Sequence, residues 1–412
     1  MITRRPLLEQ YRVSEREQKN LAILELIRRK GPITRTEISQ GTDLNIVTVS
    51  NYVSNYIQRG LVIEKGMDVS TGGRRPTLVE LNAKKTLAIG IDLGTTEAQD
   101  VEMVGLVADL AGHVEHRIAR RRSKASVEQV LACAPEMIAA LFAIEGLDRA
   151  RVEGIGIGVN GVLDEAAGTI RDVSVGGIRT SYHGFRDEME SKWGMPVLMG
   201  TDATLAALGE MRLSLAKEAR NLVYFYGDIS CGLILNGSLY WGSGGSAGQL
   251  GITRPMEDDA LSWEKSWQYL RPSGADLGIP ERARKLLNDG MAPESKLLAL
   301  AHGRADDVTF DLVVAAARDG DALARELIEH GAINLGVRIA YLVNLFNPEV
   351  VVLGGGLERA GSLLLEPVFR TVRRWAFEEP GSQVDLVPAQ LGPDAVAVGA
   401  ASLVAREVFT QV

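Results

Sequence analysis

Amide and hydroxyl side chains recur along one side of residues 46–58. At the helical period of about 100° per residue, the side chains opposite an apolar stripe are Val47, Thr48, Asn51 and Asn55. Asparagine amides can pair with adenine edges, and threonine or valine methyl groups can contact the thymine methyl. A helix that only had to stay dissolved would more often carry glutamate and lysine there. The pattern favours a helix that reads base edges in the major groove, although an ordinary helix pair within a larger fold stays open.

The neighbouring residues indicate the elements that must position this face. Thr34 and Glu37 have the spacing of an N-terminal capping box, and Gly41 marks the end of that first helix. Either Asp43 or Asn45 can cap the second helix. The residues expected to be buried on the second helix are Ile46, Val49, Val53 and Ile57. Two helices joined by so short a turn predict a helix-turn-helix, with a further helix expected before it over 14–29.

A basic loop between two expected strands follows the helix pair. Residues 61–65 and 77–81 are typical of a hairpin, and the segment 66–76 between them contains Thr-Gly-Gly-Arg-Arg-Pro. Arginines on a glycine-rich tip suit a narrow, electronegative minor groove, with a solvated basic loop as the alternative. The complete set of expected DNA contacts is Arg35, Thr36, Asn45, Val47, Thr48, Asn51, Asn55, Arg74 and Arg75.

Formal charge is distributed unevenly along the 412 residues. Residues 1–85 carry a net charge of +6, whereas the remainder carries −14. A basic N-terminal part on an acidic body is typical of a protein that meets phosphates at one end. There is no recognisable signal peptide, no apolar run of bilayer length, and no metal or redox pattern around the two cysteines. These features predict a cytoplasmic protein with no membrane partner.

Residues 86–412 alternate strands and helices in a pattern that occurs twice. A buried strand runs into a glycine and threonine turn at 92–96, and a second such round begins at 222–225. We expect one helix over 127–144 and a long helix over 311–346 that is broken near Gly320 and Gly331. The recurrence predicts an α/β fold with two related lobes. The expected domains are 1–83, 84–200 together with 396–412, and 201–395.

Three motifs in this body resemble the ROK family of repressors, open reading frames and sugar kinases. They are the stretch 334–356, with its Asn-Leu-Phe-Asn-Pro and Gly-Gly-Gly, the turn 92–96, and the Gly-x-x-Gly-x-Ala-Gly-x-x-Gly run 242–251. The resemblance covers essentially all of residues 86–412 and implies a two-lobed fold similar to actin and hexokinase. The N-terminal winged helix-turn-helix is similar to the family's repressor branch and is absent from its free kinases.

Departures from the kinase motifs argue against phosphoryl transfer. Thr95 replaces the second glycine of the family's first phosphate loop, where a side chain obstructs backbone approach to a phosphate. Glu97 stands where kinases often have lysine, and Asp228 adds negative charge to the second phosphate loop. Ile252 replaces a histidine that in many members also ligates zinc, and the cysteine run of that zinc site is missing. No catalytic residue, metal or cofactor is therefore expected.

On the sugar side, the resemblance leaves a set of polar residues in place. Asp202, preceded by Thr201, matches the family's catalytic aspartate, and its carboxylate can accept two sugar hydroxyls, with a plain helix cap as the alternative. Gln249 replaces the family's glutamate and can still bind a hydroxyl. Asn160, followed by Gly161, stands where the family usually has proline and is either a polar contact or a turn residue. These five residues are expected to bind the effector, a sugar or sugar derivative.

These features together predict a sequence-specific DNA-binding transcriptional regulator. We expect a repressor of carbohydrate-related genes that is controlled by a sugar-like ligand in a catalytically silent cleft. A homodimer or homotetramer would present paired reading helices to operator half-sites about one helical turn apart. Two alternatives stay open: an active ATP-dependent sugar kinase with an appended DNA-binding module, and a constitutive DNA-binding protein whose cleft binds nothing.

Overall fold

The computed structural model describes residues 14–67, 76–95, 101–171, 179–214, 219–227, 230–250 and 278–412. The predicted DNA contacts Arg74 and Arg75 lie outside these described residues, as do Glu97, Asp228 and Ile252. The chain divides into two compact units. The first unit takes Met1–Ile170, Thr180–Gly200 and Val396–Val412, and the second takes Arg171–Arg179 and Thr201–Ala395.

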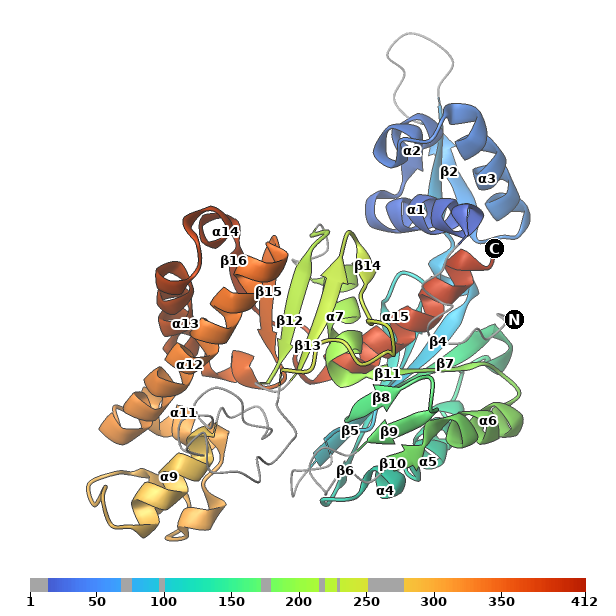
Figure 1. The fold of residues 1–412 in the computed structure, drawn as a ribbon. Coiled ribbons are helices and arrows are strands. Elements are labelled where there is room, and N and C mark those ends of the chain that lie inside the picture. Colours follow the sequence, from blue (N-terminus) through green and yellow to red (C-terminus); the bar gives the residue numbers. More distant parts are fainter. Residues whose placement is uncertain are drawn as a thin grey trace. The chain divides into compact units, whose positions relative to one another are not determined.

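Three helices and a small antiparallel sheet form the N-terminal part of the first unit (Figure 1). They are α1 (Glu15–Lys30), β1 (Ile33–Thr34), α2 (Arg35–Thr42), α3 (Ile46–Gln58), β2 (Val62–Met67) and β3 (Thr77–Leu81). Capping boxes begin both α1 and α2, the second through Thr34 and Glu37 as the sequence predicted. The strand order is β1–β3–β2, so the hairpin forms one sheet with the strand that precedes the helix pair.

A five-stranded sheet of order β11–β7–β4–β5–β6 forms the core of the first lobe. Its strands are β4 (Leu87–Asp92), β5 (Val101–Asp109), β6 (Val114–Arg122), β7 (Val152–Val159) and β11 (Val197–Thr201). β4 is antiparallel to β5 and parallel to β7, and it is buried at every position. Its residues 87–91 are all apolar or glycine, as a strand covered on both faces requires.

Where the structure describes it, the first lobe also contains four helices and a small sheet. They are α4 (Val127–Leu131), α5 (Ala134–Phe142), α6 (Tyr182–Trp193), α15 (Ala395–Thr410), β8 (Val162–Asp164), β9 (Thr169–Arg171) and β10 (Arg179–Ser181). The expectation of one helix over 127–144 was wrong, because α4 ends at Leu131 and α5 begins at Ala134. Pro135 lies in the first turn of α5, and its missing N–H prevents a continuous helix from running through it.

Helix α15 packs on the first-lobe sheet at two glycines. A Cβ at Gly90 of β4 would lie 1.9 Å from the carbonyl oxygen of Ala397, and one at Gly156 of β7 would lie 2.1 Å from that of Ala400. Only glycine leaves room for a helix backbone this close to a strand. The two central strands and α15 are therefore held in direct backbone contact.

The second unit contains another five-stranded sheet, of order β14–β13–β12–β15–β16. Its strands are β12 (Leu222–Tyr226), β13 (Ser230–Leu235), β14 (Ser238–Leu239), β15 (Val350–Gly354) and β16 (Asp385–Pro388), and its helices are α7 (Asp202–Leu213), α9 (Ile279–Asn288), α10 (Leu297–Leu300), α11 (Phe310–Arg318), α12 (Ala322–Phe346), α13 (Ser362–Trp375) and α14 (Glu378–Gln383). The expected break near Gly320 is confirmed. The one at Gly331 was wrong, since that glycine is buried inside the continuous helix α12.

The two large sheets share one topology. In each, the order across the sheet is the third, second, first, fourth and fifth strand of that sheet in chain order. In each, the first strand is antiparallel to the second and parallel to the fourth. The predicted pair of related α/β lobes is therefore confirmed. In the described ranges, no helix has the length and apolar character needed to cross a bilayer.

Candidate nucleic-acid interface and ligand site

Helix α3 is fixed by its cap and by a buried face. Asn45, rather than Asp43, is the N-cap, and its Oδ1 accepts a hydrogen bond from the Thr48 amide at 2.8 Å. The buried residues of α3 are Val49, Val53 and Tyr56. The expected burial of Ile46 was wrong, since 44% of it is exposed. At about 100° per residue, Ile46 lies at the edge of the face centred on Val49 and Val53.

The opposite face of α3 is open. Val47 is 66% exposed, and Asn51 and Asn55 are exposed as well, whereas Thr48 is half-buried. Asn45 is exposed, but its Oδ1 is already bound to the helix, so only its Nδ2 is available as a donor. This face combines amide donors and acceptors with one apolar contact, which is the chemistry of a major-groove reader.

The start of α2 carries two further predicted contacts. Thr36 is exposed, and Arg35 is half-buried. Arg35 Nη2 lies 3.6 Å from Glu64 Oε1 on β2, so this guanidinium is paired with the hairpin. A partly exposed ion pair of this length contributes little stability, so a stronger anionic partner can displace Glu64.

In the first unit, two predicted regions meet at the carboxyl ends of parallel strands. Asp92 at the end of β4 is in register with Gly158 of β7, so the turn after Asp92 and the Asn160–Gly161 turn lie at one edge of the sheet. Gly161 has φ +132°, a backbone conformation that L side chains rarely adopt. Asn160 is half-buried. Ligands of open α/β sheets bind at this kind of edge.

The side chain of Arg122, at the end of β6, binds backbone carbonyl groups of the turn after β4. Its Nη2 donates to the carbonyl oxygens of Leu93 at 2.9 Å and Thr95 at 2.5 Å, and its Nε donates to that of Leu93 at 3.2 Å. Partial burial lowers the pKa of Arg122, while Asp92 favours its charged form. The Gly94 amide donates to Asp92 Oδ1 at 2.7 Å.

In the second unit, the predicted ligand residues pack against the first residues of β13. A Cβ at Gly232 would lie 2.2 Å from the carbonyl oxygen of Ala203, which fixes the start of α7 on this strand. The Gly248 carbonyl accepts a hydrogen bond from the Cys231 amide at 2.7 Å, and Gln249 forms a bridge with Ser230. The structure therefore brings the α7 start and the glycine run together on neighbouring residues of one strand.

Asp202 is 5% exposed and lies in the first turn of α7. Its Oδ1 accepts a hydrogen bond from the Ala203 amide at 2.7 Å, while the Thr201 hydroxyl donates to that of Thr204 at 2.9 Å. Gln249 is exposed. These five predicted ligand residues fall in both units: Asn160 and Gly161 in the first, and Thr201, Asp202 and Gln249 in the second.

A carboxylate also engages the glycine turn after β15. Glu358 Oε2 accepts a hydrogen bond from the Gly356 amide at 2.9 Å. Burial raises the pKa of Glu358. Gly355, with φ +66°, sits so close to β12 that a Cβ on it would lie 2.5 Å from the Gly227 amide nitrogen. Here too a turn amide is bound to a protein carboxylate.

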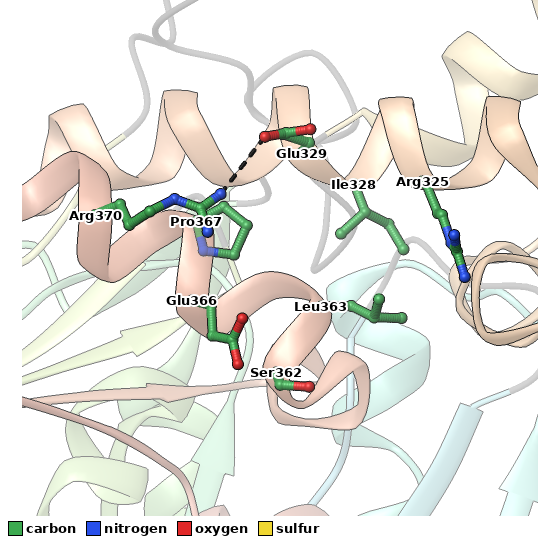
Figure 2. A pocket seen from close by; sticks show the side chains of 8 residues that line it. All are labelled: Arg325, Ile328, Glu329, Ser362, Leu363, Glu366, Pro367 and Arg370. Atoms are coloured by element: carbon green, nitrogen blue, oxygen red, sulfur yellow. Dashed lines mark ion pairs between the residues drawn. The ribbon is translucent and has the colours of Figure 1, made fainter. Parts of the chain in front are cut away.

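Sequence reasoning missed Arg122 and Glu358. Arg122 ends a run of three arginines on a strand, and this clustering was a usable signal. A separate groove of about 250 Å³ lies between α12 and α13. Figure 2 shows the side chains that line it, among them the ion pair of Arg370 with Glu329. The distance from Arg370 Nη2 to Glu329 Oε1 is 3.5 Å. None of the predicted ligand residues lines this groove. Within the described residues, no group of three or more His, Cys, Asp or Glu side chains could hold a metal ion.

Comparison with known proteins places these features in a family. The xylose repressor of Caldicellulosiruptor bescii is 28% identical over 395 residues, which cover 95% of this chain and 96% of that protein. The DNA-binding transcriptional dual regulator NagC of Escherichia coli is 27% identical over 398 residues, which cover 96% of this chain and 94% of that protein.

A solved structure is similar in fold over nearly the whole chain. It is a ROK family transcriptional regulator described as a homolog of the E. coli MLC protein, with a TM-score of 0.72 and 22% sequence identity, covering 96% of this chain and 97% of its own. The model of the ROK family itself matches residues 88–407. Since this match takes in well over half of the sequence and both lobes, the chain belongs to the ROK family.

Proposed function

We propose that this chain is a sequence-specific DNA-binding transcriptional repressor of carbohydrate-related genes, acting in the cytoplasm. In this proposal its N-terminal winged helix-turn-helix reads the operator. Its ROK body binds a sugar or sugar derivative and does not phosphorylate it. The observation that carries the proposal is that Asn51 and Asn55 are exposed on the face of α3 opposite its buried residues. Asn45 caps the first turn of this helix.

Three features support DNA reading. The face formed by Val47, Asn51 and Asn55 offers hydrogen bonds and a methyl contact but no negative charge. Residues 1–85 carry a net charge of +6 on an otherwise acidic chain. The likeness to proteins named as repressor and DNA-binding regulator extends over 95% and 96% of this chain, which takes in its N-terminal part.

Two carboxylate contacts support a ROK body that does not transfer phosphate. The Gly94 amide is bound to Asp92 and the Gly356 amide to Glu358, so both turns have an amide committed to a protein carboxylate. Phosphoryl transfer depends on donors that neutralise phosphate charge, and these arrangements place negative charge beside them. Thr95, whose carbonyl binds Arg122, also replaces a glycine of the kinase motif.

The proposed effector is a sugar-like molecule held by Asn160, Gly161, Thr201, Asp202 and Gln249. A buried carboxylate with one oxygen bound to a backbone amide is well suited to accept hydroxyl hydrogens. Relatives are named for xylose and N-acetylglucosamine regulation, so D-xylose and N-acetyl-D-glucosamine are the first probes. A homodimer or homotetramer with two-fold symmetry would match operator half-sites about one helical turn apart.

Selection from a random-sequence duplex library tests the DNA part. We expect one sequence to be enriched and to bind more tightly than random duplex at physiological salt, and one of the sugars to release it. Failure to enrich any sequence would contradict DNA reading. Incubation with ATP and a panel of hexoses and pentoses tests the rival activity. Turnover that disappears in Asp202→Ala would make the protein a sugar kinase instead.

A further inference from the structure

Asn20 of α1 joins two segments that are far apart in the sequence. Its Oδ1 accepts a 2.7 Å hydrogen bond from the hydroxyl of Tyr56 on α3. Its Nδ2 donates to the backbone oxygens of Thr410 at 3.3 Å and Val412 at 3.0 Å, at the end of α15. Asn20 and Tyr56 are each 1% exposed. One buried amide therefore links the reading helix to the last turn of α15 within the first unit.

The donor and acceptor in the hydrogen bond between Tyr56 and Asn20 are fixed. Burial raises the pKa of Tyr56 far above its ordinary range, so its hydroxyl stays protonated and donates. Arg16 of α1 also bonds the end of α15, because its Nη2 donates to the backbone oxygen of Val412 at 3.3 Å. Asn20 accepts from α3 through its Oδ1 and donates to α15 through its Nδ2, so an apolar side chain of similar shape would lose all three hydrogen bonds.

The other end of α15 lies where the chain passes between the two units. Ala395 begins the helix, and the boundary between the units falls between Ala395 and Val396. Along its length, α15 touches β4 and β7 backbone to backbone at Gly90 and Gly156. These are the strands that run into the turn after Asp92 and into Asn160. The same helix thus contacts the strands that carry proposed ligand residues and the amide that holds α3.

We propose that Asn20 is a positioning residue that couples α15 to the reading helix α3. This inference rests on the proposed function, because it names how the ligand site regulates DNA binding. A close-packed helix moves as a unit, so a displacement of α15 changes the hydrogen bonds that seat Tyr56. The coupling is reciprocal: whatever α15 does to DNA affinity, bound DNA does to α15.

The test uses the full chain and the duplex that the wild-type protein selects from a random library. Asn20→Leu removes all three hydrogen bonds with a side chain of similar shape, and Tyr56→Phe removes only the one that reaches α3. Tyr52→Phe is the matched control, because Tyr52 lies one turn earlier on α3 and its hydroxyl has no hydrogen-bond partner among the described residues. Thermal unfolding identifies the folded variants, and if Asn20→Leu does not fold, Tyr56→Phe carries the test.

Two quantities decide the outcome: duplex affinity, and hydrogen exchange of the α15 amides with and without saturating duplex. For the wild type and Tyr52→Phe, we expect the duplex to slow exchange in the last turns of α15. For Asn20→Leu and Tyr56→Phe, we expect binding weaker by on the order of tenfold and little or no slowing in α15.

The results separate this inference from the proposed function. Wild-type affinity and wild-type exchange in both variants would overturn the coupling and leave DNA reading intact. Weaker binding with an unchanged α15 response would also overturn it, because the bonds would then support α3 alone. If the wild-type protein selected no sequence, the proposed function would fail and this inference with it.

Discussion

Arg122 donates a 2.9 Å hydrogen bond from its Nη2 to the carbonyl oxygen of Leu93. The two residues lie on different strands of the first-lobe sheet or just beyond them, 29 positions apart in the sequence. A second bond from the same nitrogen reaches Thr95, so one planar guanidinium fixes both carbonyls of the turn. The turn that resembles a phosphate loop is therefore held by hydrogen bonds from the Arg122 side chain.

Replacing Arg122 with lysine should loosen this turn. The charge remains, but an ammonium group cannot reproduce the fork that reaches Leu93 and Thr95 together. We expect a loss of about 1–2 kcal/mol in the free energy of unfolding, at the lower end because Arg122 is partly exposed. Denaturant unfolding measures the loss, and hydrogen exchange at the Gly94 and Thr95 amides localises it. Unchanged exchange there would show that Arg122 does not hold the turn.

Asn51→Ala should relax sequence preference more than it weakens binding overall. Removing one amide that pairs with a base edge costs about 1–3 kcal/mol of discrimination at that base pair. Competition between the selected duplex and its single-base variants measures this. Asn288→Ala, which alters an exposed asparagine of the second unit, is the control. A uniform loss at every base pair would place Asn51 on the phosphate backbone instead.

The double variant Arg74→Ala and Arg75→Ala should weaken binding to all duplexes alike. If both arginines contact DNA, the slope of log affinity against log salt should fall by about 2. The matched control is Arg373→Ala with Arg374→Ala, two exposed neighbouring arginines on α13. An unchanged slope would mean that the hairpin tip is solvated and stays away from the duplex.

Asp202→Asn should abolish stabilisation by the effector while preserving the fold. Asparagine keeps an oxygen that can accept from the Ala203 amide, so this hydrogen bond in the first turn of α7 should remain. It loses the negative charge that favours two sugar hydroxyls. Thermal shift with D-xylose and N-acetyl-D-glucosamine measures the difference, with Asp385→Asn as an exposed control on the second-unit sheet. Full retention of the shift would leave Asp202 with a structural role in the first turn of α7 only.

Glu358→Gln should stabilise the protein at high pH and not at low pH. Burial raises the folded-state pKa of Glu358, so ionisation of this carboxyl disfavours the folded state above its unfolded pKa. That penalty disappears as the pH falls below the unfolded value and both states are protonated. The melting temperature of Glu358→Gln should therefore rise increasingly above that of the wild type as the pH is raised from about 4 to 8. Glu326→Gln, at an exposed carboxylate, is the charge-matched control, and parallel curves for Glu358→Gln would contradict the prediction.

Local sequence patterns were sufficient to predict much of the N-terminal part and the presence of two related lobes. Thr34 and Glu37 lie three residues apart, so their capping box is visible in the sequence, as is the amphipathic face of α3. The duplicated topology follows from repeated strand and turn patterns, which are also local. Where the local signal was ambiguous, the expectation was wrong: Gly331 lowers helix propensity, yet its burial in α12 outweighs that cost.

The sequence by itself determined the order and type of most elements, because caps, turns and hydrophobic periods involve neighbours along the chain. Only the tertiary structure decided which distant groups meet. Arg122 finds Leu93, and Asn20 finds both Tyr56 and Thr410, across separations that no periodic pattern records. Each of these contacts depends on strand register or helix packing, which is set by the burial of many side chains together and not by the residues that make the bond.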